Sequence, residues 1–77
     1  MFRYTLRKEN LFNPDIGRYI SFGIVAFKKT DSGWVHCAFV SDVSTDHDAV
    51  LDLVRRCNKH QLSPVHLWDV IEDFLNA

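Results

Sequence analysis

The chain has 77 residues, a formal net charge of −1 at pH 7, and 47% hydrophobic and 25% charged residues. This length predicts a single domain with one modest core, and the composition argues against disorder and collagen-like structure. The near-neutral charge gives no global electrostatic reason to expect a nucleic acid or an anionic membrane as partner. The longest apolar stretch, residues 22–27, is too short to span a bilayer, which takes about 20 residues.

The first half of the chain predicts three antiparallel strands. Apolar and polar residues alternate over residues 2–6, which is typical of a strand with one buried face. Residues 10–17 contain Asn-Pro-Asp and a glycine, so we expect a loop there. Aromatic and β-branched residues over 18–28 indicate a second strand. A tight turn at 30–33 then leads into a third strand, residues 34–40.

The second half changes to helical spacing. Ser44 or Thr45 is expected to cap a first helix that ends near Lys59. Its apolar stripe has the spacing i, i+3, i+4, i+7 and consists of Val50, Leu53, Val54 and Cys57. Ser63 is expected to cap a second helix, with Pro64 in its first turn. The apolar face of that helix is expected to contain Leu67, Trp68, Ile71, Phe74 and Leu75.

These elements predict an α+β fold, a three-stranded antiparallel meander followed by two amphipathic helices packed on one face (β-β-β-α-α). Four segments are Ser21-Phe22-Gly23-Ile24, Val40-Ser41-Asp42-Val43-Ser44-Thr45-Asp46, Leu62-Ser63-Pro64-Val65-His66-Leu67 and Asp69-Val70-Ile71-Glu72-Asp73-Phe74. Together they resemble a small bacterial family known only as a domain of unknown function, mostly from anaerobic Gram-positive bacteria. The resemblance implies a small bacterial protein of the cytoplasm and implies no catalytic or binding residues. The charged N-terminal segment MFRYTLRKEN is likewise unlike a signal peptide.

No pattern of residues predicts catalysis or a cofactor. The chain has no GxSxG motif and no glycine-rich phosphate loop, so we expect a protein that is not an enzyme. Cys57 and His60 have C-x-x-H spacing and His66 follows, but a fourth zinc ligand is missing because His47 lies about 15 Å away along the helix. We therefore expect no metal site, and we expect both cysteines to be reduced and buried.

Charge is distributed unevenly along the chain. Residues 1–41 contain six basic and three acidic groups, whereas residues 42–77 contain three basic and seven acidic groups. A basic sheet with Tyr19, Phe27 and Trp34 as stacking platforms would suit RNA. Because the excess of basic groups is small and the helices are acidic, nucleic-acid binding is the weaker expectation.

The central strand is apolar on both faces. Ile20, Phe22, Ile24 and Ala26 alternate with Tyr19, Val25 and Phe27, although a sheet covered by helices on one side is normally polar on the other. Three things could account for the second face: cover by Leu11, Phe12 and Ile16 of the 10–17 loop, a partner that is most simply a second copy packed sheet to sheet, or pairing of an exposed edge strand, which would also make a dimer.

The sequence therefore favours a non-catalytic protein–protein interaction module. It is expected to homodimerise or to bind another protein through a candidate interaction face consisting of Tyr19, Val25, Phe27 and Trp34. The alternative is a small-ligand-binding domain with a pocket between sheet and helices near Trp68 and Phe22.

Overall fold

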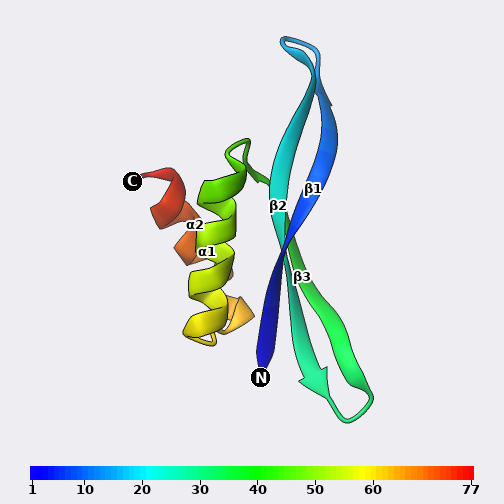
Figure 1. Ribbon diagram of the computed structural model, residues 1–77, viewed down its shortest axis with the longest axis vertical. Coiled ribbons are helices and arrows are strands. Elements are labelled where there is room, and N and C mark those ends of the chain that lie inside the picture. Colours follow the sequence, from blue (N-terminus) through cyan, green and yellow to red (C-terminus); the bar gives the residue numbers. More distant parts are fainter.

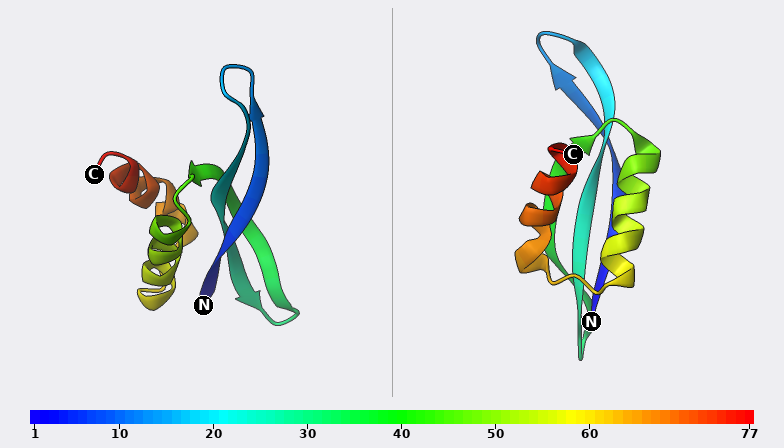
Figure 2. Two further views of the ribbon diagram at one scale, coloured as in Figure 1. Left: turned by 45° about the horizontal axis from the view of Figure 1, so that its top comes forward. Right: turned by 90° about the vertical axis from the view of Figure 1, so that its left-hand side faces the viewer.

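The computed structural model describes residues 1–77 as a three-stranded sheet followed by two helices. The elements are β1 (Phe2–Asn13), β2 (Gly17–Thr30), β3 (Gly33–Ser44), α1 (His47–Lys59), the 3₁₀ helix η1 (Pro64–His66) and α2 (Leu67–Leu75). The strands are antiparallel in the order β1-β2-β3, so β2 is central. Both helices lie on one side of the twisted sheet and leave the other side open (Figures 1 and 2). The predicted α+β fold and its β-β-β-α-α order are confirmed.

The predicted loop over residues 10–17 is wrong in its first half. β1 continues to Asn13, which pairs directly with Gly17. The Asn-Pro-Asp motif forms only the tight turn between them, in which the Asn13 backbone carbonyl accepts from Ile16 N–H and the Asn13 side chain accepts from Asp15 N–H. Gly17 completes this turn at φ +81°, a conformation that favours glycine.

The end of the β1–β2 hairpin forms an arm, which we define as residues 10–20. The pairing of β3 with β2 ends at Phe22 and Ser44, so the arm is a two-stranded ribbon that extends beyond the third strand and beyond the helices (top of Figure 1). Phe12 and Ile16 in the arm are 69% and 68% exposed. The apolar residues of this segment therefore do not fold back over the open face of the sheet.

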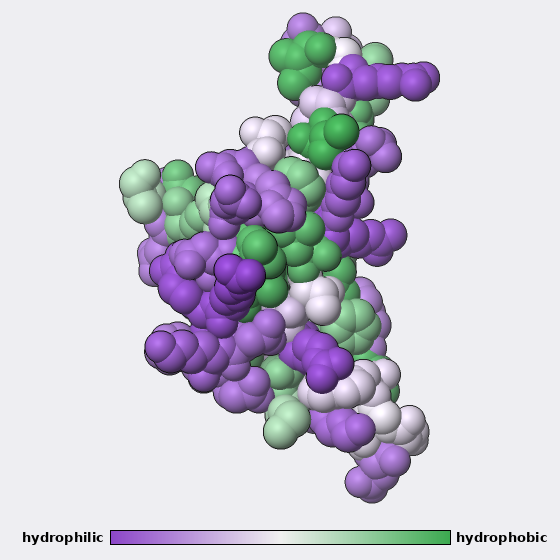
Figure 3. Space-filling model, in the orientation of Figure 1, coloured by the Kyte–Doolittle hydropathy of each residue, from purple (hydrophilic) through white to green (hydrophobic).

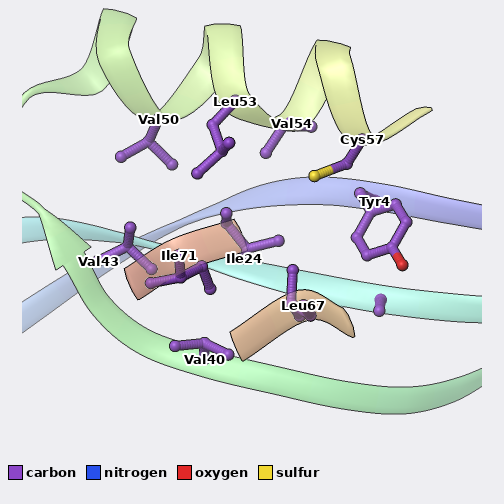
Figure 4. Packing of buried hydrophobic residues seen from close by; sticks show 11 residues of the cluster. Tyr4, Ile24, Val40, Val43, Val50, Leu53, Val54, Cys57, Leu67 and Ile71 are labelled. Atoms are coloured by element: carbon purple, nitrogen blue, oxygen red, sulfur yellow. The ribbon is translucent and has the colours of Figure 1, made fainter. Parts of the chain in front are cut away.

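The hydrophobic core lies between the sheet and the helices. The predicted stripe of α1 is confirmed, because its four residues are all buried and point to the sheet (Figure 4). Tyr4 is 1% exposed, and its hydroxyl donates to the backbone carbonyl of Leu62. Burial raises the pKa of Tyr4 to about 12, because the charged phenolate is poorly solvated there. The core consists of Tyr4, Ile24, Ala26, Val40, Val43, Val50, Leu53, Val54, Cys57, Leu67 and Ile71.

The predicted cap of the first helix, Ser44 or Thr45, is wrong by one or two residues, whereas Ser63 does occupy the cap position before Pro64. Asp46 caps α1, since its carboxylate accepts from Ala49 N–H, while the Ser44 hydroxyl accepts from Asp46 N–H one step earlier. The second helix starts with a 3₁₀ turn at Pro64, and the Ser63 side chain makes no capping hydrogen bond. The chain thus turns gradually into α2.

Three residues that were expected to be buried are exposed. Trp68 and Leu75 are 61% and 57% exposed because α2 directs Leu67 and Ile71 to the sheet and leaves this flank uncovered. Cys37 is exposed beside a register irregularity of β3, whereas Cys57 lies in the core as expected. Both cysteines are free thiols, in agreement with the prediction.

Candidate interaction face

Strand alternation places the predicted interaction residues on the open side of the sheet. Val25 and Phe27 are on the β2 face opposite the core residues, and the β2–β3 register brings Trp34 next to Lys29 on the same side. Tyr19 has the same orientation but lies in the arm, several residues from this group. The structure therefore groups Val25, Phe27 and Trp34 and separates Tyr19 from them.

The apolar residues of this face are covered mainly by cations of the same chain. The Arg3 guanidinium lies 4.6 Å and the Lys29 ammonium 5.5 Å from the centre of the Trp34 ring. The Arg7 guanidinium lies 5.1 Å from the centre of the Phe39 ring. Although no helix crosses this side, neighbouring side chains leave Val25 only 6% exposed. Long cationic side chains can cover apolar surface while their charged ends remain in water.

The three cations on the open face lack an anionic partner within the protein. The ion pairs of the chain are His47 with Asp48 and Arg56 with Asp52, all in α1. The acidic side chains of the helical half lie in or next to the two helices, namely Asp46, Asp48, Asp52, Asp69, Glu72 and Asp73. The three cations therefore lie opposite an acidic helical layer, while the carboxylates on their own side, Glu9 and Asp42, are at the base of the arm. The hydrophilic side chains on both flanks are visible in Figure 3.

Sequence analysis did not identify Arg3, Arg7 or Lys29 as part of this face. The signal for the two arginines was present, because residues that alternate with buried Tyr4 and half-buried Leu6 must face the other side of β1. Their stacking on Trp34 and Phe39 depends on the pairing register across three strands, which the turns alone do not determine.

A polar cluster closes the open face at the base of the arm. One Asp42 oxygen accepts from Ser21 and the other accepts from Tyr19 at 2.7 Å. Glu9 accepts from the Ser41 hydroxyl at 2.7 Å and from Asp42 N–H at 2.8 Å. The hydrogen bonds from Ser21 and then Tyr19 lower the pKa of Asp42, and the bond to Asp42 raises the pKa of Tyr19. The cluster links all three strands and fixes the root of the arm.

The other candidate sites are less well supported by the geometry. Cys57 is buried, and desolvation raises the pKa of its thiol, which disfavours the thiolate that binds metals. His60 and His66 are exposed, and the structure contains no group of three or more histidine, cysteine, aspartate or glutamate residues that could hold a metal ion. A hollow between the helices is lined by Leu53, Arg56, Cys57, His60, Leu62 and Val70. Neither Trp68 nor Phe22 lines a hollow of the surface.

No helix has the length and apolar character needed to cross a membrane. Searches of curated proteins and of solved structures found no match. A family model does match, and it covers residues 1–77. The chain therefore belongs to the Family of unknown function (DUF6514).

Proposed function

We propose that the protein is a non-catalytic interaction module that binds an acidic segment of another protein through the open face of its sheet. The observation that carries this proposal is the set of three cations, Arg3, Arg7 and Lys29, held over aromatic rings without an anionic partner. Carboxylates of a partner would complete their charge-assisted hydrogen bonds without displacing the rings below.

Charge complementarity favours a different protein over a second copy at this face. A two-fold contact between two open faces would bring the cations of one copy close to the same cations of the other, which costs free energy. An acidic segment avoids that cost. The rings beneath the cations, half-buried Trp34 and exposed Phe39, add apolar contact area, so the proposed partner has aromatic or aliphatic residues between its acidic ones.

The geometry also favours protein over single-stranded RNA. RNA recognition on a sheet needs open aromatic faces on which bases stack. Here Trp34 and Phe39 already lie under cationic side chains, and the edge of one ring of the Phe27–His36 pair meets the face of the other at a centroid distance of 5.9 Å. The rings are engaged within the chain, whereas the charges are not.

Binding to poly-L-glutamate, measured by the fluorescence of Trp34, tests the proposal. Trp68→Phe leaves Trp34 as the only tryptophan, and it changes a side chain on α2 that is 61% exposed. We expect saturable binding that weakens about tenfold or more when Arg3, Arg7 and Lys29 are all replaced by glutamine. The matched control replaces three cations elsewhere, Arg18, Arg55 and Lys59, and is expected to change affinity less than about threefold.

A second control separates charge from packing, since Arg3 and Arg7 also cover the rings. Arg3→Lys with Arg7→Lys keeps the charges and is expected to retain most of the binding. Absence of binding to poly-L-glutamate, or an equal loss in the two glutamine triple variants, would overturn the proposal. Tighter binding of poly(U) than of poly-L-glutamate at the same salt concentration would replace the protein partner with RNA.

A further inference from the structure

The outer edge of β1 is protected over only part of its length. The Asn58 side chain accepts from Tyr4 N–H at 2.7 Å and donates to the Tyr4 carbonyl at 2.8 Å. Gln61 does the same for Phe2, at 3.0 Å in each direction. These two amides imitate a neighbouring strand, and they block the pairing of another chain at the start of β1.

The same edge is open in the arm. Backbone groups alternate along an antiparallel strand, so the even-numbered residues that follow Phe2 and Tyr4 also point away from β2. Side-chain hydrogen bonds reach this edge only at Phe2 and Tyr4, which leaves the N–H and C=O groups of Asn10 and Phe12 facing outwards. The arm therefore presents a short unpaired strand edge beyond the helical layer.

The arm also lacks a layer to pack against. It is two-stranded, and Phe12, Ile16 and Ile20 are 69%, 68% and 46% exposed. An isolated two-stranded hairpin is at best marginally stable in water, and a third strand or a packed layer is needed to stabilise it. The open β1 edge can accept a further strand, which would give the arm the third strand that it lacks.

We propose that this strand is β1 of a second copy, and that two arms pair antiparallel about a two-fold axis. The contact would join two three-stranded sheets into a continuous sheet of six strands. The axis is placed at Leu11, which lies opposite the partner's Leu11. Asn10 then lies opposite the partner's Phe12, and the two residues exchange backbone hydrogen bonds. This association does not depend on the acidic partner proposed for the open face.

The residues of the arm favour this register over one with the axis at Glu9. An axis at Glu9 would set two Glu9 carboxylates opposite each other, which is destabilising. With the axis at Leu11, two leucines meet on the open side of the sheet. On the helix side, the two Phe12 side chains become diagonal neighbours within reach of each other. Lys8 then lies opposite the partner's Pro14, whose missing N–H ends the ladder at no cost.

A second copy is favoured over an unrelated strand because the edge is self-complementary. In an antiparallel pair of identical edges, the N–H and C=O groups of each copy bond the same groups of the other. Because a two-fold contact uses the β1 arm edge of both copies, no further copy can add at that edge. The paired surface is small for a specific interface, so we expect association at micromolar concentrations.

Disulfide cross-linking at the axis tests the register. Cys37→Ser removes the exposed thiol, and Cys57 is buried, so Leu11→Cys adds the only accessible cysteine. Directly opposed residues of a non-hydrogen-bonded pair have Cβ atoms about 4.5–5.5 Å apart, close enough for a disulfide after a small adjustment. We expect most chains to form the cross-linked dimer on mild oxidation. Ile16→Cys in the same background, at the exposed arm tip, is the control and is expected to cross-link at least fivefold less. Equal cross-linking of the two variants, or none at Leu11→Cys, would overturn the proposal.

Sedimentation tests the edge itself. Asn10→Pro removes an outward N–H that takes no part in the β1–β2 ladder, and proline is tolerated at such edge positions. We expect the wild type to be dimeric at about 100 µM and Asn10→Pro to dissociate at least tenfold more readily. Asp31→Pro, in the turn of the opposite hairpin, is expected to remain dimeric. A monomeric wild type at this concentration, or a dimer unaffected by Asn10→Pro, would show that the arms do not pair.

Discussion

At the scale of single residues, Gly23 shows how closely the strands approach on the open face. A Cβ atom at this position would lie 2.6 Å from the Val40 carbonyl oxygen, 3.0 Å from a Phe39 ring carbon and 3.1 Å from Glu9 Oε2. The sequence showed only that glycine interrupts the apolar row of β2. The structure explains the interruption, because β3 shifts its register beside Gly23 and brings its backbone over the position.

Gly23→Ala is therefore expected to lower the free energy of unfolding by about 1–3 kcal/mol, the usual cost of inserting a methyl group where backbone atoms cannot move away. Urea denaturation measures the change. The control is Gly17→Asn, since Gly17 has open space around it and asparagine tolerates its positive φ better than other residues. A Gly23→Ala variant as stable as the wild type would mean that β3 moves freely at this point.

The predicted interaction residues show what alternation alone determines. Period-two spacing correctly assigned Tyr19, Val25 and Phe27 to one face of β2. It did not predict that Val25 is buried, because its cover comes from neighbouring strands whose register the sequence leaves open. The sequence thus predicted which side of the sheet is unusual, but not that cations cover it.

At the scale of elements, regular periodicity predicted the buried residues well, whereas the boundaries of strands and helices were predicted poorly. The buried stripe of α1 was predicted residue by residue, since helical spacing and burial coincide in a helix packed along its whole length. The strand content of residues 10–13 was missed because Asn-Pro-Asp chemistry indicates a turn without indicating where the turn begins. The cap is Asp46, and neither Ser44 nor Thr45 as predicted, because β3 extends to Ser44.

The short helix α2 was the hardest element to orient. Leu67 and Trp68 are adjacent and both apolar, and sequence analysis assigned both to the buried face. In the structure Leu67 is 1% exposed and Trp68 lies on the uncovered flank. A one-position rotation decides between them, and the 3₁₀ turn that precedes α2 sets that rotation.

This orientation predicts a large difference between two neighbouring substitutions. Leu67→Ala is expected to cost about 2–5 kcal/mol because it leaves a cavity in the core, which approaches the total stability of a domain of this size. Trp68→Ala is expected to cost less than about 1 kcal/mol, as for other exposed positions. Thermal and urea unfolding of the two variants measure the difference. Similar losses in both would contradict the observed rotation of α2.

At the scale of the whole molecule, the chain combines a packed body with an unsupported extension. The body contains the core between sheet and helices, whereas residues 10–20 have neither a third strand nor a helix beside them. Local unfolding is easiest where few apolar contacts and many exposed backbone hydrogen bonds are found together. The arm meets both conditions, and its root is fixed by the hydrogen bonds among Glu9, Ser21 and Asp42.

Hydrogen exchange at two protein concentrations is expected to reveal this division. At about 1 µM, below the expected association range, the arm amides should exchange much faster than those of Ile24 and Ala26, which lie in the core. At about 100 µM the outward amides of Asn10 and Phe12 should slow selectively, because pairing of two arms gives them acceptors, while the core amides stay unchanged. Arm amides as protected as Ile24 at the lower concentration would show that the hairpin is stable without a neighbour, and the physical reason for a second copy would then disappear.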